Sequence, residues 1–246
     1  MQDWLALPVV ALLGGLVALT PLGSQVLRRG VVFIDLAVAQ AAAAAVIWVH
    51  FVIDLESIWL DQLAASAGAL LLSLSIAGIT RRWGEQREAL IGLLYVIGAC
   101  LAMLGANAHP HGKEKLMQLL AADVLWVNTP SVLALAMCAA VMAALRQTRW
   151  LERDAVFYGL FALVTSLAVP ALGLFLVFSF LMAPALWIPR GLGHHTAVLA
   201  AWAAALLGLL VSWLLDTPSG PSIALTLTLW GVGSVMYRPT PGRPSS

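Results

Sequence analysis

Apolar residues fill most of the chain in long runs that short polar stretches interrupt. A membrane-spanning helix needs about 20 mostly apolar residues. The candidate runs cover residues 4–22, 31–53, 62–80, 88–106, 129–145, 154–169, 171–188, 196–215 and 221–237. Val169, Pro170 and Ala171 separate the sixth and seventh runs, which predicts either two short spans or one broken helix with a small extra one. The pattern predicts an all-α, polytopic transmembrane helical bundle of about 8–9 spans.

Composition restricts the class of protein further. Of the 246 residues, 61% are hydrophobic and 10% are charged, and the mean hydropathy is +0.94. A soluble domain carries about a quarter of charged residues, and no soluble fold of this size buries so much apolar surface. A soluble enzyme, a disordered chain and a disulfide-rich secreted domain are therefore excluded. We expect a multi-pass protein of the cell membrane.

Basic residues predict how the bundle is oriented. With the N-terminus outside, 11 arginines fall in inner loops or the C-terminal tail, and only Lys113 and Lys115 fall outside. The positive-inside rule therefore favours an outer N-terminus, a cytoplasmic C-terminus and an odd number of spans. We expect one transmembrane permease domain over residues 1–237. The Pro-rich polar residues 238–246 are expected to form a short, disordered cytoplasmic tail.

Asp35 is the exceptional charge within an apolar run. A carboxylate inside the membrane is expensive and is a functional-site candidate by default. The alternative is that Asp35 lies near the inner interface, where it pairs with Arg28 or Arg29 or is hydrated. Gln40 follows five residues later, and its amide either joins the same pathway or only bridges helices.

The remaining motifs give weaker chemical signals. His109 and His111 lie beside Glu114 in an outer loop and could bind a soft divalent ion, although loops often carry two histidines without such a role. The chain has no GxxxxGK[ST] phosphate loop and no HExxH or GxSxG motif. It is therefore not expected to be an enzyme, and coupling to ATP would need a separate subunit.

Several stretches resemble one transporter family, in that family's order along the chain. These are Pro21-Leu22-Gly23-Ser24 with Arg28-Arg29 and Phe33-Ile34-Asp35, residues 88–95, residues 173–185, residues 212–221 and the outer segment 119–127. They resemble the membrane permease subunits of the ABC importers for zinc, manganese or iron. The family commonly carries Gly-Asp with a His four residues after the Asp, where this chain has Ile34, Asp35 and Ala39. The chain is thus similar to a divergent branch, which either holds its ion with other ligands or carries another substrate.

The resemblance implies a homodimeric or pseudo-dimeric bundle that moves a divalent metal ion by alternating access at the interface between copies. It implies that a lipid bilayer surrounds the bundle. It implies no permanently bound cofactor and no nucleic-acid partner. A separate ATP-binding subunit would bind inside, and an extracytoplasmic solute-binding protein would dock outside. The residues implied are Asp35 and Gln40 for the pathway; Ala183, Pro184, Leu186, Pro189 and Arg190 for coupling to the ATPase; His109, His111, Glu114, Asp123 and Asp216 for outer docking or gating; and Asp35, His109 and His111 for the metal.

Other functions stay open from the residues alone. A permease for another small solute has the same composition. A secondary transporter would show internal repeats and more ionisable groups in its spans, and an intramembrane enzyme would need converging catalytic groups. A membrane scaffold is the remaining alternative.

Overall fold

A computed structural model describes residues 6–52, 57–83, 86–108 and 112–236, and these residues form helices and loops without a strand. The all-α prediction is therefore confirmed. The α-helices are α1 (Ala6–Arg29), α2 (Ile34–Val52), α3 (Ile58–Arg82), α4 (Arg87–Ala108), α5 (Gly112–Leu120), α6 (Thr129–Arg146), α7 (Asp154–Leu172), α8 (Leu174–Trp187), α9 (His194–Leu215) and α10 (Ser219–Met236). Short 3₁₀ turns cover Val124–Trp126, Arg149–Glu152 and Ile188–Arg190.

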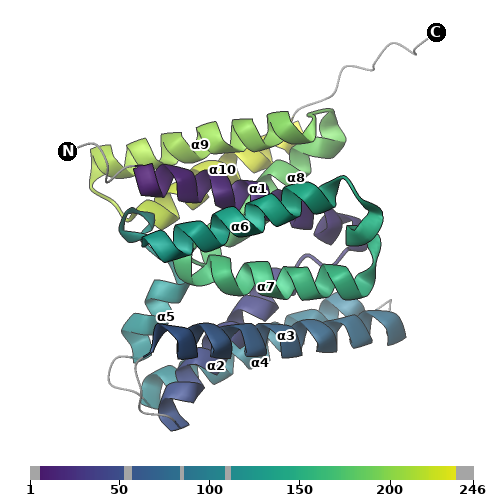
Figure 1. The fold of residues 1–246 in the computed structure, drawn as a ribbon, viewed down its shortest axis with the longest axis vertical. Coiled ribbons are helices and arrows are strands. Elements are labelled where there is room, and N and C mark those ends of the chain that lie inside the picture. Colours follow the sequence, from purple (N-terminus) through teal and green to yellow (C-terminus); the bar gives the residue numbers. More distant parts are fainter. Residues whose placement is uncertain (1–5, 53–56, 84–85, 109–111, 237–246) are drawn as a thin grey trace.

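The helices form two groups that meet along α7 (Figure 1). In one group α1 packs against α6 and α8, while α10 packs against α8 and α9. In the other group α2 packs between α3 and α4, and α5 lies against α4. Helix α7 packs mainly on α3 and also contacts α1 and α6, so it joins the two groups.

Six helices in the described part of the chain are long and apolar enough to cross a membrane: α1, α3, α4, α6, α7 and α9. Ile34–His50 in α2 and Leu174–Arg190 are shorter apolar helices. These helices agree with a multi-pass membrane protein. The count of 8–9 spans and the placement of the termini stay predictions, and the tail 238–246 lies outside the described residues.

The break between the sixth and seventh apolar runs is at Gly173, and it separates two helices. Gly173 has φ +81°, a left-handed conformation that side chains other than glycine rarely adopt. Pro170 lies inside α7, three residues before this break. Because proline has no N–H, the carbonyl of Ser166 loses its helical donor, and the Gln62 amide of α3 donates to it instead at 3.4 Å. The sequence predicted the boundary at Pro170. The hydrogen bond from Gln62 of α3 instead lets α7 continue past Pro170 to Leu172.

Small residues allow the helices to approach closely. A Cβ atom on Gly23 of α1 would lie 1.8 Å from the carbonyl oxygen of Leu181 in α8. A Cβ on Gly68 of α3 would lie 2.7 Å from the carbonyl oxygen of Ala41 in α2. The Ala-rich stretch of α2 is correspondingly buried. Small residues favour such close packing of membrane helices, and the burial of this stretch within the chain agrees with it.

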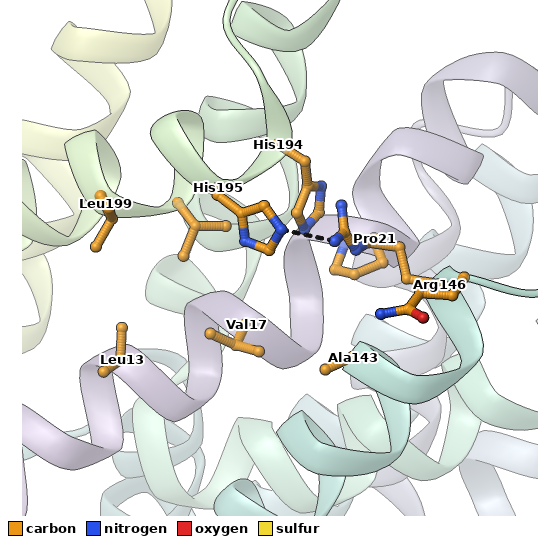
Figure 2. Close-up of a pocket in the computed structure, with 10 residues that line it drawn as sticks. Leu13, Val17, Pro21, Ala143, Arg146, His194, His195 and Leu199 are labelled. Atoms are coloured by element: carbon orange, nitrogen blue, oxygen red, sulfur yellow. Dashed lines mark hydrogen bonds between the residues drawn. The ribbon is translucent and has the colours of Figure 1, made fainter.

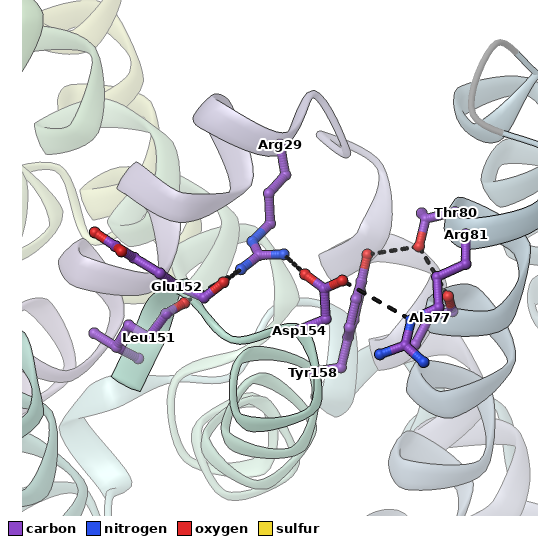
Figure 3. A network of polar contacts seen from close by, with 8 residues as sticks. All are labelled: Arg29, Ala77, Thr80, Arg81, Leu151, Glu152, Asp154 and Tyr158. Carbon is purple, nitrogen blue, oxygen red and sulfur yellow. Dashed lines mark hydrogen bonds and ion pairs between the residues drawn. The ribbon is translucent and has the colours of Figure 1, made fainter. Parts of the chain in front are cut away.

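An ionic network ties the end of α1 to α7 and α3 (Figure 3). Arg29 donates to the carboxylate of Asp154 and, at 2.8 Å, to the carbonyl of Glu152. Its guanidinium also lies 4.5 Å from the ring centroid of Phe157. Arg81 of α3 reaches the other oxygen of Asp154 at 3.9 Å. The end of the bundle that carries most of the basic residues is thus held by one shared carboxylate.

The seam between α3 and α7 continues from this network through hydroxyl groups. The Tyr158 and Thr80 hydroxyls share a hydrogen bond of 3.1 Å, and Ser73 donates to the Tyr158 carbonyl at 2.7 Å. Ser73 is fully buried. Hydrogen bonds between buried groups fix the register of the two helices because each unsatisfied polar group would cost free energy.

We predict opposite effects for two glycine substitutions. Gly23→Ala should lower the free energy of unfolding by about 1–3 kcal/mol, and with it the melting temperature, because the new methyl group overlaps the α8 backbone. Gly78→Ala on α3 should keep or raise stability, because a Cβ there meets nothing within 4 Å and alanine favours the helix. Melting curves of the two purified variants in one detergent make the comparison. Equal melting temperatures would contradict the close α1–α8 approach.

Candidate functional site

A cavity of about 530 Å³ opens between α2, α3, α6 and α7 at the end of the bundle opposite the ionic network. Its walls combine small apolar residues of α2 with polar groups from the other elements. The lining residues are Ala42, Ala43, Val46, Asp61, Gln62, Ala65, Gln118, Leu119, Ala122, Asp123, Trp126, Asn128, Ser131, Ser166, Val169 and Pro170. We call it the outer cavity, after the side predicted for it from the basic residues.

Asp35 lies on the face of α2 that lines the outer cavity. It precedes Ala42 by seven residues, which is about two helical turns and roughly 10 Å along the axis. Seven residues correspond to nearly two full turns, so Asp35, Ala42 and Val46 share one side of the helix. Ala39, where the family commonly has His, lies between them and is 3% exposed. Between the cavity and Asp35, this side of α2 thus carries small, buried apolar residues.

The Asp35 carboxylate is enclosed and unpartnered. The residue is 0% exposed, and neither carboxylate oxygen has a hydrogen-bond partner among the described residues. Arg29 binds Asp154 instead, and Arg28 is exposed. The alternative reading, in which Asp35 anchors Arg28 or Arg29, is therefore wrong. A buried carboxylate is expensive, although the N–H groups at the start of α2 favour negative charge there, so Asp35 is a candidate for binding a cation.

The Gln40 side chain lies on a different side of α2 from Asp35. Five residues turn an α-helix by about 140° beyond one full turn, and Gln40 packs against α4, where a Cβ on Gly98 would lie 3.1 Å from the Gln40 Cβ. The structure therefore does not show the two side chains at one site within this chain. Their joint role in a pathway stays a prediction.

The outer segment 121–126 is clamped against the junction of α7 with α8 and the start of α10. A Cβ on Gly173 would lie 2.5 Å from the backbone nitrogen of Ala122, and one on Gly220 would lie 2.2 Å from its carbonyl oxygen. Ser219 donates to the Asp123 carboxylate and accepts from the backbone N–H of Val124 at 2.9 Å. The motif around Pro218-Ser219-Gly220 thus holds this segment in place beside the outer cavity.

The other outer candidates are less closely connected to the cavity. Glu114 is exposed in the first turn of α5. Asp216 caps α9 in a left-handed conformation with φ 51° and is exposed. His109 and His111 lie outside the described residues. Within the described part of the chain, no three His, Cys, Asp or Glu side chains form a group that could hold a metal ion.

Sequence reasoning did not single out several polar residues of the cavity. The Gln62 amide donates to the Ser66 hydroxyl at 3.2 Å, and the hydroxyls of Ser66 and Ser166 lie 3.1 Å apart. Asp61 lies at the cavity wall with one oxygen 2.5 Å from His50 Nε2. These residues come from helices far apart in the sequence, so no local motif marks them. Asp61 lies in the first turn of α3, where an acidic residue is common whatever its function.

The segment implied for coupling lies at the opposite end of the bundle. Ala183 and Pro184 are buried in α8, whereas Pro189 is exposed in the following 3₁₀ turn. Trp187 stacks on Trp230 of α10 with ring centroids 5.5 Å apart, and Arg190 donates to the Ser234 carbonyl. The turn is thus anchored on α10.

A cavity of about 590 Å³ lies beside this turn. Arg28, Glu152, Ile188 and Pro189 contribute to its lining. The anchored turn and the cavity beside it thus form one continuous surface at this end of the bundle.

Comparisons with known proteins identify the kind of transporter that this chain resembles. The ABC 3 transport family matches residues 153–238. A probable metal transport system membrane protein of Chlamydia pneumoniae is 24% identical over 266 residues, covering 96% of this chain and 90% of the relative. A probable metal transport system membrane protein of Chlamydia muridarum is 23% identical, covering 89% and 84%.

The fold has a solved counterpart. The structure of PsaBC from Streptococcus pneumoniae in complex with Fab matches with a TM-score of 0.73 and 18% identity, covering 94% of this chain and 90% of that chain. Nearly the whole arrangement of helices is therefore shared. The resemblance drawn from the sequence motifs is confirmed: the chain resembles the membrane permeases of metal ABC importers, and its residues 153–238 carry the match to the ABC 3 transport family.

Proposed function

We propose that this chain is the permease subunit of an ABC importer that moves a divalent metal ion across the membrane. The observation that carries the proposal is Asp35, a buried carboxylate without a partner on the α2 face that lines the outer cavity. The similarity to probable metal transport system membrane proteins supports a cationic cargo. Two copies would assemble side by side, and the basic end of each would face the cytoplasm.

The enclosure of Asp35 supports alternating access. Because Asp35 is 0% exposed, an ion reaches it only if the surrounding helices move apart. Passage inward then requires the ionic network around Asp154 to open or shift. Binding of ATP by a separate subunit would supply the free energy for these movements.

The available donors favour a hard cation. The polar groups that line the outer cavity offer carboxylate, amide and hydroxyl oxygens, which suit manganese, while zinc prefers added imidazole or thiolate. Ala39 in place of a His removes the imidazole nearest to Asp35. A manganese cargo is therefore the first choice, with iron next.

Asp35→Asn should abolish metal uptake without loss of stability. The amide keeps the volume and removes the charge that attracts the cation. Because the carboxylate has no partner to lose, the melting temperature should stay equal or rise. Uptake per reconstituted complex and the melting curve are measured on the same preparation. Arg82→Gln, which removes an exposed charge on α3, is the control and should transport normally.

Two results would contradict this role. Normal uptake by Asp35→Asn would remove the residue from the pathway. Unchanged uptake per folded complex with a markedly lower melting temperature would assign it a structural role. If the wild-type complex moved a neutral solute and no metal, the alternative permease function would be correct.

We also propose that the turn after α8 binds the ATP-binding subunit. Pro189→Glu adds a negative charge to the exposed turn and should weaken ATPase binding at least about tenfold. The reason is that burying one unpaired charge in the interface costs several kcal/mol. Gln86→Glu adds the same charge on another exposed loop at this end and should bind normally. Copurification and ATP turnover of both variants make the test. Equal weakening by both would show a general charge effect, and no weakening by either would place the ATPase elsewhere.

The clamped outer segment is proposed as part of the docking surface and outer gate for the solute-binding protein. Gly220→Ala should displace the segment because its Cβ would overlap the Ala122 carbonyl, and affinity for the binding protein should fall. Gly233→Ala on the same helix α10 is the matched control, since a Cβ there meets nothing within 4 Å. Binding is measured by surface plasmon resonance on the two folded variants. Equal affinities would remove the segment from the docking surface.

A further inference from the structure

A further cavity lies on the side of the bundle, away from the proposed pathway. It has a volume of about 300 Å³ and lies between α1, α6 and α9, as Figure 2 shows. Its lining residues are Leu13, Val17, Pro21, Ala143, Arg146, Gln147, His194, His195, Val198 and Leu199. Basic groups gather at one end of it, and apolar side chains form the rest. We call it the lateral groove.

Among the described residues, Arg146 at the basic end has no acidic side chain as a partner. Arg146 Nη2 lies 2.8 Å from His195 Nε2, so a guanidinium donates to an imidazole rather than to a carboxylate. No acidic residue lines the groove, and no ion pair with Arg146 occurs among the described residues. In the adjoining cavity, which Arg146 and His194 also line, the acidic group is Glu152. An anion between these side chains would accept hydrogen bonds from all of them.

The start of α9 adds to this positive field. Helix α9 begins at His194, and its N-cap Gly193 provides no side-chain acceptor. The first N–H groups of a helix carry a partial positive charge and attract anions. The start of α9 and Arg146 therefore present positive charge to the groove, and His194 and His195 add imidazole N–H donors beside it.

The apolar part has the length and position of a lipid chain site. Leu13, Val17 and Pro21 recur every four residues on α1 and extend over about 12 Å along the axis. This approaches the hydrocarbon thickness of one leaflet, about 15 Å. Leu199 is 58% exposed on the outer side of α9, so the groove lies on the surface that meets lipid. Pro21 leaves the Val17 carbonyl without its helical donor, which loosens α1 at this position.

We infer that the lateral groove binds an anionic phospholipid. Its phosphate accepts hydrogen bonds from Arg146, His194 and His195, and an acyl chain lies along Leu13, Val17 and Leu199. Basic pockets between spans at the basic end of a membrane protein suit such headgroups. The apolar part lies at membrane depth, beyond the reach of a soluble subunit.

The test measures lipid retention by the full-length purified chain in detergent. Native mass spectrometry with added phosphatidylglycerol or phosphatidylcholine gives the apparent affinity for each lipid. Arg146→Gln and the double variant His194→Gln/His195→Gln should each weaken phosphatidylglycerol binding by about tenfold, as loss of a charge-assisted hydrogen bond implies, with little change for phosphatidylcholine. Arg82→Gln, which removes an exposed charge on α3 at the same end, is the control and should bind as the wild type does.

A third variant tests the apolar half. Ala143→Trp fills the groove from α6 without altering charge, and it should also weaken phosphatidylglycerol binding. Inorganic phosphate at the same concentration should not displace the lipid. Displacement by phosphate together with normal binding by Ala143→Trp would overturn the proposal in favour of a simple anion site.

Two further outcomes decide against a lipid. Equal phosphatidylglycerol affinity in wild type, Arg146→Gln and Ala143→Trp would overturn the proposal directly. A lower dimer fraction in these variants at unchanged lipid affinity would show that the groove contacts a second copy. Melting curves confirm that each variant is folded, and the Ala143→Trp result decides the matter if a charge variant unfolds.

Discussion

Close backbone contact between helices is the constraint on which this structure depends. Lipid tails are as apolar as leucine, so burial of apolar side chains gives helices little reason to associate inside a bilayer. Association then depends on packing area, which is greatest where small residues let backbones meet. Gly23 against Leu181 joins α1 to α8, and Gly68 against Ala41 joins α3 to α2. Gly173 and Gly220 hold Ala122 in the same way, so one physical device builds both the bundle and its outer clamp.

Satisfaction of polar groups is the second requirement, because no water reaches them within the bilayer core. The carbonyl freed by Pro170 receives the Gln62 amide, and Glu88 uses one oxygen to accept from the backbone N–H of Val32 at 2.7 Å. Asp35 differs because both of its carboxylate oxygens are without a partner in the described part of the chain. The half-buried Glu88 is satisfied through one oxygen, whereas the fully buried Asp35 is not, and this difference is the physical argument for proposing a cation there.

The sequence predicted the helices and singled out Asp35 as a candidate for good physical reasons. Apolar runs of spanning length, and a lone charge within one of them, are local signals. The break at Gly173 was not predicted, because Pro170 is the stronger helix breaker and the amide that compensates for it comes from α3. The pairing of Arg29 with Asp154, 125 residues apart, has no local signal either. The outer cavity draws on α2, α3, α6 and α7, so its composition appears only once these helices are packed together.

The two ends of the structure are built with different polar chemistry, and this difference suits directional transport. The outer end gathers neutral amides, hydroxyls and carboxylates around a cavity, which offers a cation several weak oxygen ligands. The other end is closed by Arg29, Arg81 and Asp154, where two guanidinium groups share one carboxylate. In the transport function proposed above, a cation leaving Asp35 toward this end would meet positive charge while the network is closed. Asp154 belongs to α7, which packs on α3 and touches α1, so a shift between the two helix groups would separate Asp154 from Arg29 or from Arg81. The same movement would then open the bundle and let the ion pass, as the proposed alternating access requires.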